Sequence, residues 1–169
     1  AHTSGLADYF QGNGTSGKSL EDEIINGRDQ FWNFEQAIER TKAMKPLFSP
    51  GTKNKANYSD ANFQLLGKII EVITNKTYSA NCDELIIKPL KLSSYYLYKY
   101  TTDKTPKTLY YQAKELNIPQ AMTSFGADGG MVSTSADMLI FIESFFTGKL
   151  FPKEYINELK EWNKIFSPL

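Results

Sequence analysis

Apolar residues recur at intervals of three and four along most of this chain, which predicts helices separated by polar or Gly/Pro-marked loops. Sustained alternation of apolar and polar residues, the mark of β-strands, is scarce. The clearest helix runs from Ser59 to Thr74, where one face carries Phe63, Leu66, Ile69, Ile70 and Ile73. Asn75 follows and predicts a left-handed cap. The pattern therefore indicates a mostly α fold.

Caps and helix breakers predict five shorter helices in addition. Their expected first residues are Ser19, Asn33, Ser79, Thr134 and Pro152. Four stops are expected, at Asn26-Gly27, Pro46, Pro89 and Gly148. The last two helices carry apolar stripes that we expect to be buried, namely Met138, Phe141, Ile142 and Phe145, then Tyr155, Ile156, Leu159 and Trp162.

Residues 92–125 have a less regular pattern. Their tyrosines at 95, 96, 98 and 100 are typical of strands, but residues 101–106 are polar and irregular. We therefore expect extended or loop structure there. The glycine-rich run at 126–130 is flexible enough to let backbone pass close to another surface.

Length and charge narrow the class of protein. A chain of 169 residues suits one domain with one core. Lys and Arg number 19, as do Asp and Glu, so charge gives no reason to expect nucleic acid or an anionic membrane as partner. No apolar run approaches the roughly 20 residues that span a bilayer. No metal or cofactor is expected, and we interpret the single cysteine, Cys82, as a buried residue instead of a reactive thiol.

The most informative local pattern runs from Phe48-Ser49-Pro50-Gly51 to Tyr58-Ser59-Asp60. It places a tyrosine on a rigid loop just before the strongest helix, where a phenol oxygen can face a cleft. No partner for chemistry is obvious, because the chain has one His, one Cys and no serine followed three residues later by lysine. The glycines within residues 11–18 stand at the wrong offsets for a phosphate loop, so we interpret them as surface loop.

Two further motifs flank this pattern. His2-Thr3-Ser4-Gly5-Leu6 lies near the start, and Gly129-Gly130-Met131-Val132-Ser133-Thr134 with Asp137 lies near the end. In this order the three motifs resemble the serine beta-lactamase and penicillin-binding-protein family, specifically its class C-like branch with esterases and D-amino-acid peptidases. Residues 62–71 and Lys88-Pro89-Leu90 extend the resemblance over nearly the whole chain.

The resemblance implies a helical domain of a beta-lactamase/transpeptidase-like fold, without the α/β domain. Members of the family have a Ser-x-x-Lys motif with the nucleophile, a Tyr-x-Asn motif, and a Lys-Thr-Gly or His-x-Gly motif, and only the middle one is present in this chain. Residues 1–169 are thus expected to be a single helical domain, a fragment of a larger two-domain hydrolase. The parent would cleave a beta-lactam, a D-amino-acid peptide or an ester through an acyl-enzyme, and the isolated chain would be inactive. The alternative is a non-catalytic helical binding module from a degenerate relative.

The resemblance also implies roles for two residues. Tyr58 would be catalytic, taking a proton from the serine and then from water, with family lysines favouring its phenolate. Without those lysines it is expected to titrate like an ordinary tyrosine, and the alternative is that it only packs against its loop. Asp60 would bind substrate where the family often has Asn, keeping the acceptor but losing the donor. Capping of the next helix is the alternative role for Asp60.

The remaining expectations concern the terminus and the partners. His2 lies too close to the terminus to serve a catalytic triad, and Ser4 and Gly5 are interpreted as structural. The resemblance implies a small-molecule or peptidoglycan-like substrate for the parent, and a bacterial location that is periplasmic, extracellular or at the cell surface. Apolar residues left uncovered by the missing α/β domain are expected to drive dimerisation.

Overall fold

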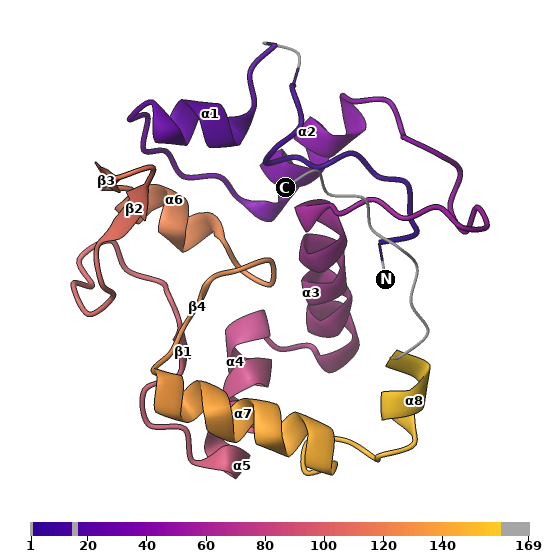
Figure 1. Cartoon of the computed structure of the whole chain (residues 1–169), viewed down its shortest axis with the longest axis vertical. Helices are drawn as coiled ribbons and strands as arrows, with labels where there is room; N and C mark the ends of the chain where they lie inside the picture. Colours follow the sequence, from indigo (N-terminus) through magenta and orange to yellow (C-terminus); the bar gives the residue numbers. More distant parts are fainter. Residues whose placement is uncertain (1, 15–16, 160–169) are drawn as a thin grey trace. The chain divides into compact units, whose positions relative to one another are not determined.

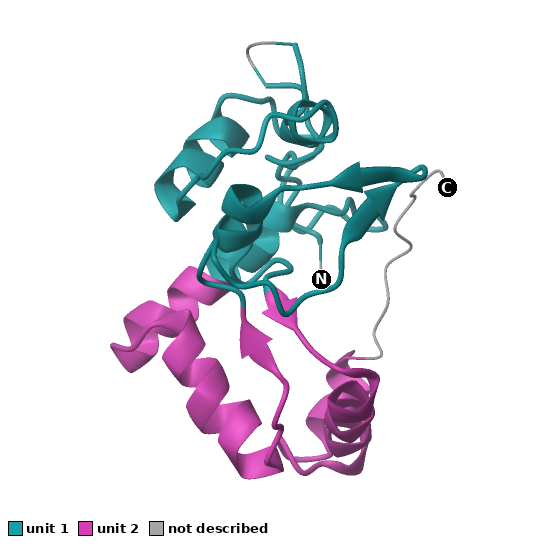
Figure 2. Cartoon of the chain, turned by 90° about the vertical axis from the view of Figure 1, so that its left-hand side faces the viewer, with its two compact units in different colours: residues 1–66, 98–130, 163–169 teal, residues 67–97, 131–162 magenta. Residues whose placement is uncertain are grey.

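The computed structural model describes residues 2–14 and 17–159 (Figure 1). They form two compact units (Figure 2). The described part of the first unit comprises 2–14, 17–66 and 98–130, and that of the second comprises 67–97 and 131–159. These residues contain eight α-helices, one π-helical segment and four short strands. The prediction of a mostly α helical domain is therefore wrong: the chain is helix-rich, but it also contains two separate two-stranded sheets. Each strand is only two or three residues long, too short for alternation to reveal it.

The first helices of the first unit begin where the sequence predicts. α1 (Leu20–Ile25) follows Ser19, whose Oγ accepts a hydrogen bond from Asp22 N at 2.9 Å while the Asp22 carboxylate accepts one from Ser19 N. α2 (Phe34–Lys42) follows Asn33 through the same reciprocal arrangement. Both capping boxes satisfy N–H groups that the helix itself leaves without partners.

An apolar cluster with aromatic packing holds the first unit together. Its buried members are Tyr9, Leu20, Ile24, Trp32, Ala37, Ala61 and Ala121. The rings of Trp32 and Phe125 are perpendicular, with centroids 5.1 Å apart. The Trp32 backbone N–H also donates to Ser124 Oγ at 2.8 Å. Edge-to-face pairs add roughly 0.5–1.5 kcal/mol beyond the burial of area, so this cluster joins segments far apart in the sequence.

A β-hairpin lies in the segment that the sequence predicted to be extended or loop. β2 (Leu109–Tyr111) pairs antiparallel with β3 (Lys114–Leu116). The two residues between them both have positive φ, 47° at Gln112 and 65° at Ala113. This backbone suits a tight hairpin, but neither residue is the Gly or Asn that signals such a turn in a sequence.

A helix in the same segment was not predicted. α6 (Pro119–Ser124) has no side-chain cap from its own N-cap residue. Asp29 caps it instead, since Gln120 N–H donates to Oδ2 at 3.0 Å and Ala121 N–H donates to Oδ1 at 2.9 Å. Because the capping residue lies 91 positions before the first of these donors, no local pattern could show it.

The second unit contains a continuous helical run made of α4 (Tyr78–Cys82), the π-helical segment η1 (Asp83–Ile87) and α5 (Lys88–Leu90). Thr77 caps the run through Oγ1, which accepts from Ala80 N at 3.2 Å. The predicted start at Ser79 is therefore wrong, because Thr77 is the capping residue and the helix begins at Tyr78.

Pro89 does not stop this run, contrary to the prediction. It lies in the first turn of α5, directly after η1. Pro89 has no N–H to donate within this run, and the Lys88 N–H just before it bonds to Asp83 O, five residues back, in the π pattern. The run ends instead at Lys91, which has a left-handed φ of 56°.

Both predicted ends of the helix after residue 134 are confirmed, whereas the predicted start of the last helix at Pro152 is wrong, because that helix begins at Tyr155. β1 (Tyr96–Leu97) pairs antiparallel with β4 (Met131–Val132), and α7 (Ser135–Thr147) follows. Thr134 caps α7, and Gly148 with φ 80° ends it. Asp137 does not complete a capping box, since its carboxylate accepts from Ser94 N at 2.6 Å.

The apolar stripes are more exposed than their periodicity predicts. α3 (Asp60–Thr74), which belongs to both units, and α7 carry most of them. The stripe residues that stay exposed, by 37% to 77%, are Leu66, Ile69, Ile70, Ile73, Met138 and Ile142. α8 (Tyr155–Leu159) buries Ile156 but exposes Tyr155 and Leu159, and Trp162 lies outside the described residues. The described residues thus leave these helix faces largely uncovered.

Two smaller predictions are confirmed. Asn75 adopts a left-handed φ of 53° after α3. Cys82 is buried, with 6% of its surface exposed. Among the described helices, none has the length and apolar character needed to cross a membrane.

Candidate functional site

Residues 2–6 hold the loop that carries Tyr58, residues 47–58, through backbone hydrogen bonds. The N–H groups of Leu47, Gly51 and Asn57 donate to the carbonyls of Gly5, Thr3 and His2 at 2.8, 2.9 and 3.0 Å. Gly5 has a φ of 73°, and a Cβ on it would lie 1.9 Å from the carbonyl oxygen of Phe48. Only glycine fits there, so the first and second sequence motifs are fixed against each other.

Tyr58 and Asp60 are joined directly at the end of this loop. The Tyr58 hydroxyl donates to Asp60 Oδ1 at 2.6 Å. Tyr58 is 41% exposed, whereas Asp60 is 8% exposed and is the first residue of α3. The structure thus brings the two predicted site residues together, with the phenol accessible and the carboxylate beneath it.

The prediction that Tyr58 titrates like an ordinary tyrosine is wrong. Burial raises the pKa of Tyr58, and the hydrogen bond to Asp60 and the charge of that carboxylate raise it further. Ionising the phenol would place a second negative charge beside Asp60. In the surroundings that the described residues provide, Tyr58 is therefore a proton donor.

The pKa of Asp60 is raised above that of an ordinary aspartate. Burial raises the pKa of Asp60 to about 6, the charges of Asp8, Asp128 and Glu21 act in the same direction, and the hydrogen bond from Tyr58 opposes them. The carboxylate therefore changes charge in the range just below neutrality.

Asp8 and Asp128 are acidic neighbours that the sequence reasoning did not single out. Phe10 N–H donates to Asp8 Oδ1 at 2.9 Å, and the Tyr9 hydroxyl donates to Asp128 Oδ2 at 2.6 Å. Asp8 Oδ2 and Asp128 Oδ1 are buried without a hydrogen-bond partner among the described residues. Burial raises the pKa of both carboxyls. Asp128 lies in the glycine-rich run, which was the one available signal, whereas nothing in the sequence marks Asp8.

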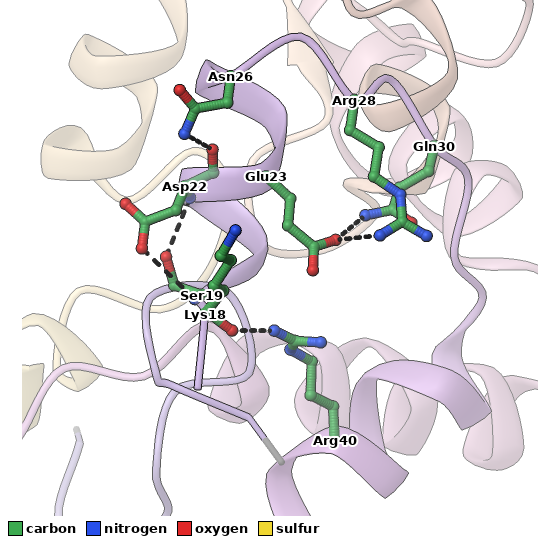
Figure 3. A network of polar contacts seen from close by, with 8 residues as sticks. All are labelled: Lys18, Ser19, Asp22, Glu23, Asn26, Arg28, Gln30 and Arg40. Carbon is green, nitrogen blue, oxygen red and sulfur yellow. Dashed lines mark hydrogen bonds and ion pairs between the residues drawn. The ribbon is translucent and has the colours of Figure 1, made fainter. Parts of the chain in front are cut away.

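Arg40 fixes the backbone next to this acidic group. Its Nε donates to Tyr9 O at 3.0 Å and its Nη2 to Lys18 O at 2.8 Å. Figure 3 shows the second of these bonds together with the polar network around α1, in which Glu23 accepts from Arg28 and Gln30. Because backbone carbonyls occupy two of its nitrogens, this guanidinium has a structural role.

Among the described residues, the site combines a phenol with carboxylates, and no ion pair brings a positive charge to them. In the described part of the chain, the ion pairs are formed by Glu23, Glu39, Glu71 and Glu84, and none includes Asp8, Asp60 or Asp128. The described residues also contain no group of three His, Cys, Asp or Glu side chains placed to hold a metal ion. A phenolate is favoured only where cations lie close by, so these residues alone do not make Tyr58 a base.

Known hydrolases are similar to this chain both by sequence and by structure. The chain is 29% identical over 162 residues to the teichoic acid D-alanine hydrolase of Staphylococcus aureus (strain MRSA252), an alignment that covers 94% of this chain and 36% of that protein. It superposes on a D-stereospecific amidohydrolase from Streptomyces with a TM-score of 0.78 at 27% identity, covering 99% of this chain and 50% of the other.

A second solved structure shares the fold. The D-amino acid amidase from Ochrobactrum anthropi, complexed with L-phenylalanine, matches 99% of this chain and 46% of its own with a TM-score of 0.76 at 23% identity. The chain therefore spans about a third of the curated relatives' length and half of the solved ones. The sequence model of the beta-lactamase family matches residues 1–167. With the family motifs in order and the tyrosine motif at the start of α3, this chain belongs to the beta-lactamase family.

Proposed function

We propose that this chain is part of a serine hydrolase that cleaves D-aminoacyl esters or amides through an acyl-enzyme. Tyr58 transfers the proton, and Asp60 holds the Tyr58 hydroxyl in place. The observation that carries the proposal is the 2.6 Å hydrogen bond between Tyr58 Oη and Asp60 Oδ1 on an accessible loop. The substrate class is supported by two relatives, a teichoic acid D-alanine hydrolase and a D-stereospecific amidohydrolase.

The nucleophile and its lysine belong, in this proposal, to parts of the full-length protein outside these 169 residues. Support comes from the lengths of the relatives, of which this chain covers 36% to 50%. The exposed apolar faces of α3 and α7 are further support, because a second domain would cover them. The isolated chain should then fold without acylating.

Proton transfer by Tyr58 also requires a cation. Asp60, Asp8 and Asp128 all raise the pKa of Tyr58, and a neighbouring ammonium group would offset them. A catalytic lysine supplies one such group, and the free α-ammonium of a D-aminoacyl ester supplies another. A beta-lactam or an N-acylated peptide has no ammonium there, which is why we favour the D-aminoacyl class over them.

The full-length product of the gene tests the activity. We expect it to hydrolyse a D-alanyl ester, with release of D-alanine, at least roughly 10-fold faster than the N-acetylated ester, which would release N-acetyl-D-alanine. The Tyr58→Phe variant should acylate roughly 100-fold more slowly or worse, the scale of lost general-base help. Tyr110→Phe, which removes a hydroxyl from a side chain that is 65% exposed on β2, is the matched control and should act like the wild type. An unchanged rate in Tyr58→Phe would show that another group takes the proton.

The isolated chain tests the proposed division of the site. Incubation with a fluorescent penicillin should leave no covalent adduct on it, and an adduct on any residue would contradict the proposal. A full-length reading frame without a Ser-x-x-Lys motif would instead favour the non-catalytic binding module.

A further inference from the structure

His2 packs against the aromatic rings at the start of α3. Its ring centroid lies 4.7 Å from that of Tyr58, with a tilt of 34°, and 5.2 Å from that of Phe63 in an edge-on arrangement. The rings of Tyr58 and Phe63 are 6.2 Å apart. The imidazole therefore supports one side of the Tyr58 ring and limits how that ring can turn.

A chain of hydrogen bonds fixes the polar edge of His2. Leu6 N–H donates to Ser4 Oγ at 3.2 Å, and the Ser4 hydroxyl donates to Asn62 Oδ1 at 2.7 Å. This orients the Asn62 amide so that Nδ2 faces His2 Nδ1 at 3.3 Å. Since an amide nitrogen can only donate, Nδ1 is the acceptor.

A second donor reaches the same ring nitrogen. Ser59 N–H points to His2 Nδ1 at 3.4 Å. With two donors facing Nδ1, the imidazole proton lies on Nε2 and the ring is neutral. Burial lowers the pKa of His2, which agrees with a neutral ring near pH 7.

The backbone carbonyl of His2 holds Asn57, the residue before Tyr58. Asn57 N–H donates to His2 O at 3.0 Å, and Asn57 Nδ2 donates to Tyr58 O at 2.8 Å. His2 thus contacts Tyr58 and both of its neighbours in the chain, Asn57 and Ser59. No other role is assigned to His2 by the proton transfer proposed above.

We propose that His2 is a positioning residue for Tyr58. Its neutral ring, accepting at Nδ1 from Ser59 and Asn62, holds the phenol at the angle from which its hydroxyl reaches Asp60. The proposal rests on the proposed function of Tyr58 for its kinetic consequence, but the geometry can be tested without activity.

Two substitutions of His2 test the aromatic ring and the hydrogen-bond acceptor of the imidazole separately. His2→Phe keeps a ring but removes the acceptor, whereas His2→Asn loses the ring but keeps an acceptor, Oδ1, at the position of Nδ1. In the full-length protein acting on a D-alanyl ester, His2→Phe should lower kcat roughly 10- to 100-fold with KM little changed, the scale of a misplaced catalytic group. His2→Asn should recover the part of that loss that comes from the acceptor, but not the part that comes from the ring contact with Tyr58.

A double variant distinguishes positioning from general damage. If His2 acts through Tyr58, adding His2→Phe to Tyr58→Phe should lower kcat no further, since neighbouring residues that act together are not additive. A full additional loss in the double variant, or a loss in KM alone, would overturn the proposal.

Nitration of tyrosines in the same full-length variants gives a readout independent of catalysis. A Tyr58 hydroxyl held by Asp60 ionises less and reacts slowly, so His2→Phe should raise the nitration rate at Tyr58 by roughly 3-fold or more. Tyr110, which is 65% exposed and distant in sequence, serves as the internal reference and should not change. An unchanged rate at Tyr58 would overturn the positioning role even if the full-length protein hydrolyses nothing, whereas a lack of hydrolysis would count only against the proposed function.

Discussion

Asp29 Oδ1 accepts a hydrogen bond from Ala121 N–H at 2.9 Å, although the two residues are 92 positions apart in the chain. The other oxygen of the same carboxylate binds Gln120 N–H at 3.0 Å. A carboxylate at the amino end of a helix also meets the positive end of the helix dipole. A single side chain thus fixes where α6 begins against the loop after α1.

Removing this cap should destabilise the first unit. Asp29→Ala is expected to lower the free energy of unfolding by about 1 kcal/mol, and by at most roughly 2, as for other lost caps. Asp29→Asn keeps one acceptor and should lose less. Urea unfolding followed by Trp32 fluorescence would measure both, since that ring packs against the segment that α6 leads into. Equal losses for the two variants would contradict a capping role.

Gly5→Ala should be more damaging than an ordinary substitution of glycine. The new Cβ would meet the Phe48 carbonyl oxygen at 1.9 Å, and the residue would keep a φ of 73°. We expect a loss of roughly 3 kcal/mol in the free energy of unfolding. Gly17→Ala is the matched control, because its φ is 72° but nothing lies within 4 Å of the added carbon. It should show only the cost of the backbone conformation, roughly 1 kcal/mol.

Asp60→Asn should stabilise the isolated chain at neutral pH. The pKa of Asp60 is about 6 in the folded chain against an ordinary 3.8, so the folded state binds the extra proton and loses stability as pH rises from 3.8 to 6. Asparagine cannot ionise but still accepts from Tyr58. The gain at pH 7 should be about 1 kcal/mol once solvent screening is allowed for.

Denaturant unfolding between pH 4 and pH 8 would check this difference. The two proteins should differ little below pH 4 and diverge by pH 7, and a difference that does not depend on pH would show that ionisation of Asp60 is not its cause. Tyr58→Phe removes the donor that stabilises the Asp60 carboxylate, so in that background the difference should begin at the same pH but keep growing to a higher pH.

The isolated chain is expected to dimerise at raised concentration. Val72 and Ile73 of α3 are 73% and 77% exposed, and Leu139 of α7 is 67% exposed. Patches of this kind commonly mark surfaces that another protein covers. Sedimentation velocity should show a concentration-dependent dimer, which Ile73→Lys with Leu139→Lys should weaken. A monomer at all concentrations would contradict the expectation.

The sequence predicted those features that depend on neighbours along the chain. The caps at Ser19, Asn33 and Thr134 and the left-handed Asn75 all follow from residues within one turn. α6 was missed because its cap, Asp29, is distant, and the β2–β3 turn was missed because its positive-φ residues are Gln112 and Ala113.

The candidate site could also be predicted only where it depends on neighbours along the chain. The sequence predicted Tyr58 on a loop just before the strongest helix, which Ser59 and Asp60 open, and the structure joins Tyr58 to Asp60 by a hydrogen bond. The sequence could not predict the negative charges near Asp60, because only tertiary packing brings Asp8 and Asp128 close to it. The error in the titration of Tyr58 has the same cause, since its nearest ionisable group is a carboxylate.

The π-helical segment at 83–87 has a consequence for comparing this protein with its relatives. A π-turn accommodates one extra residue in an α-helix: its five residues turn through about the same angle as four residues of α-helix, so the residues after it keep the facing of a regular helix that is one residue shorter. Relatives that keep a regular α-helix at this point should therefore align with a one-residue gap between Cys82 and Lys88. Deleting Glu84 should therefore convert the run into an ordinary helix while Lys88, Pro89 and Leu90 keep the neighbours that they have now.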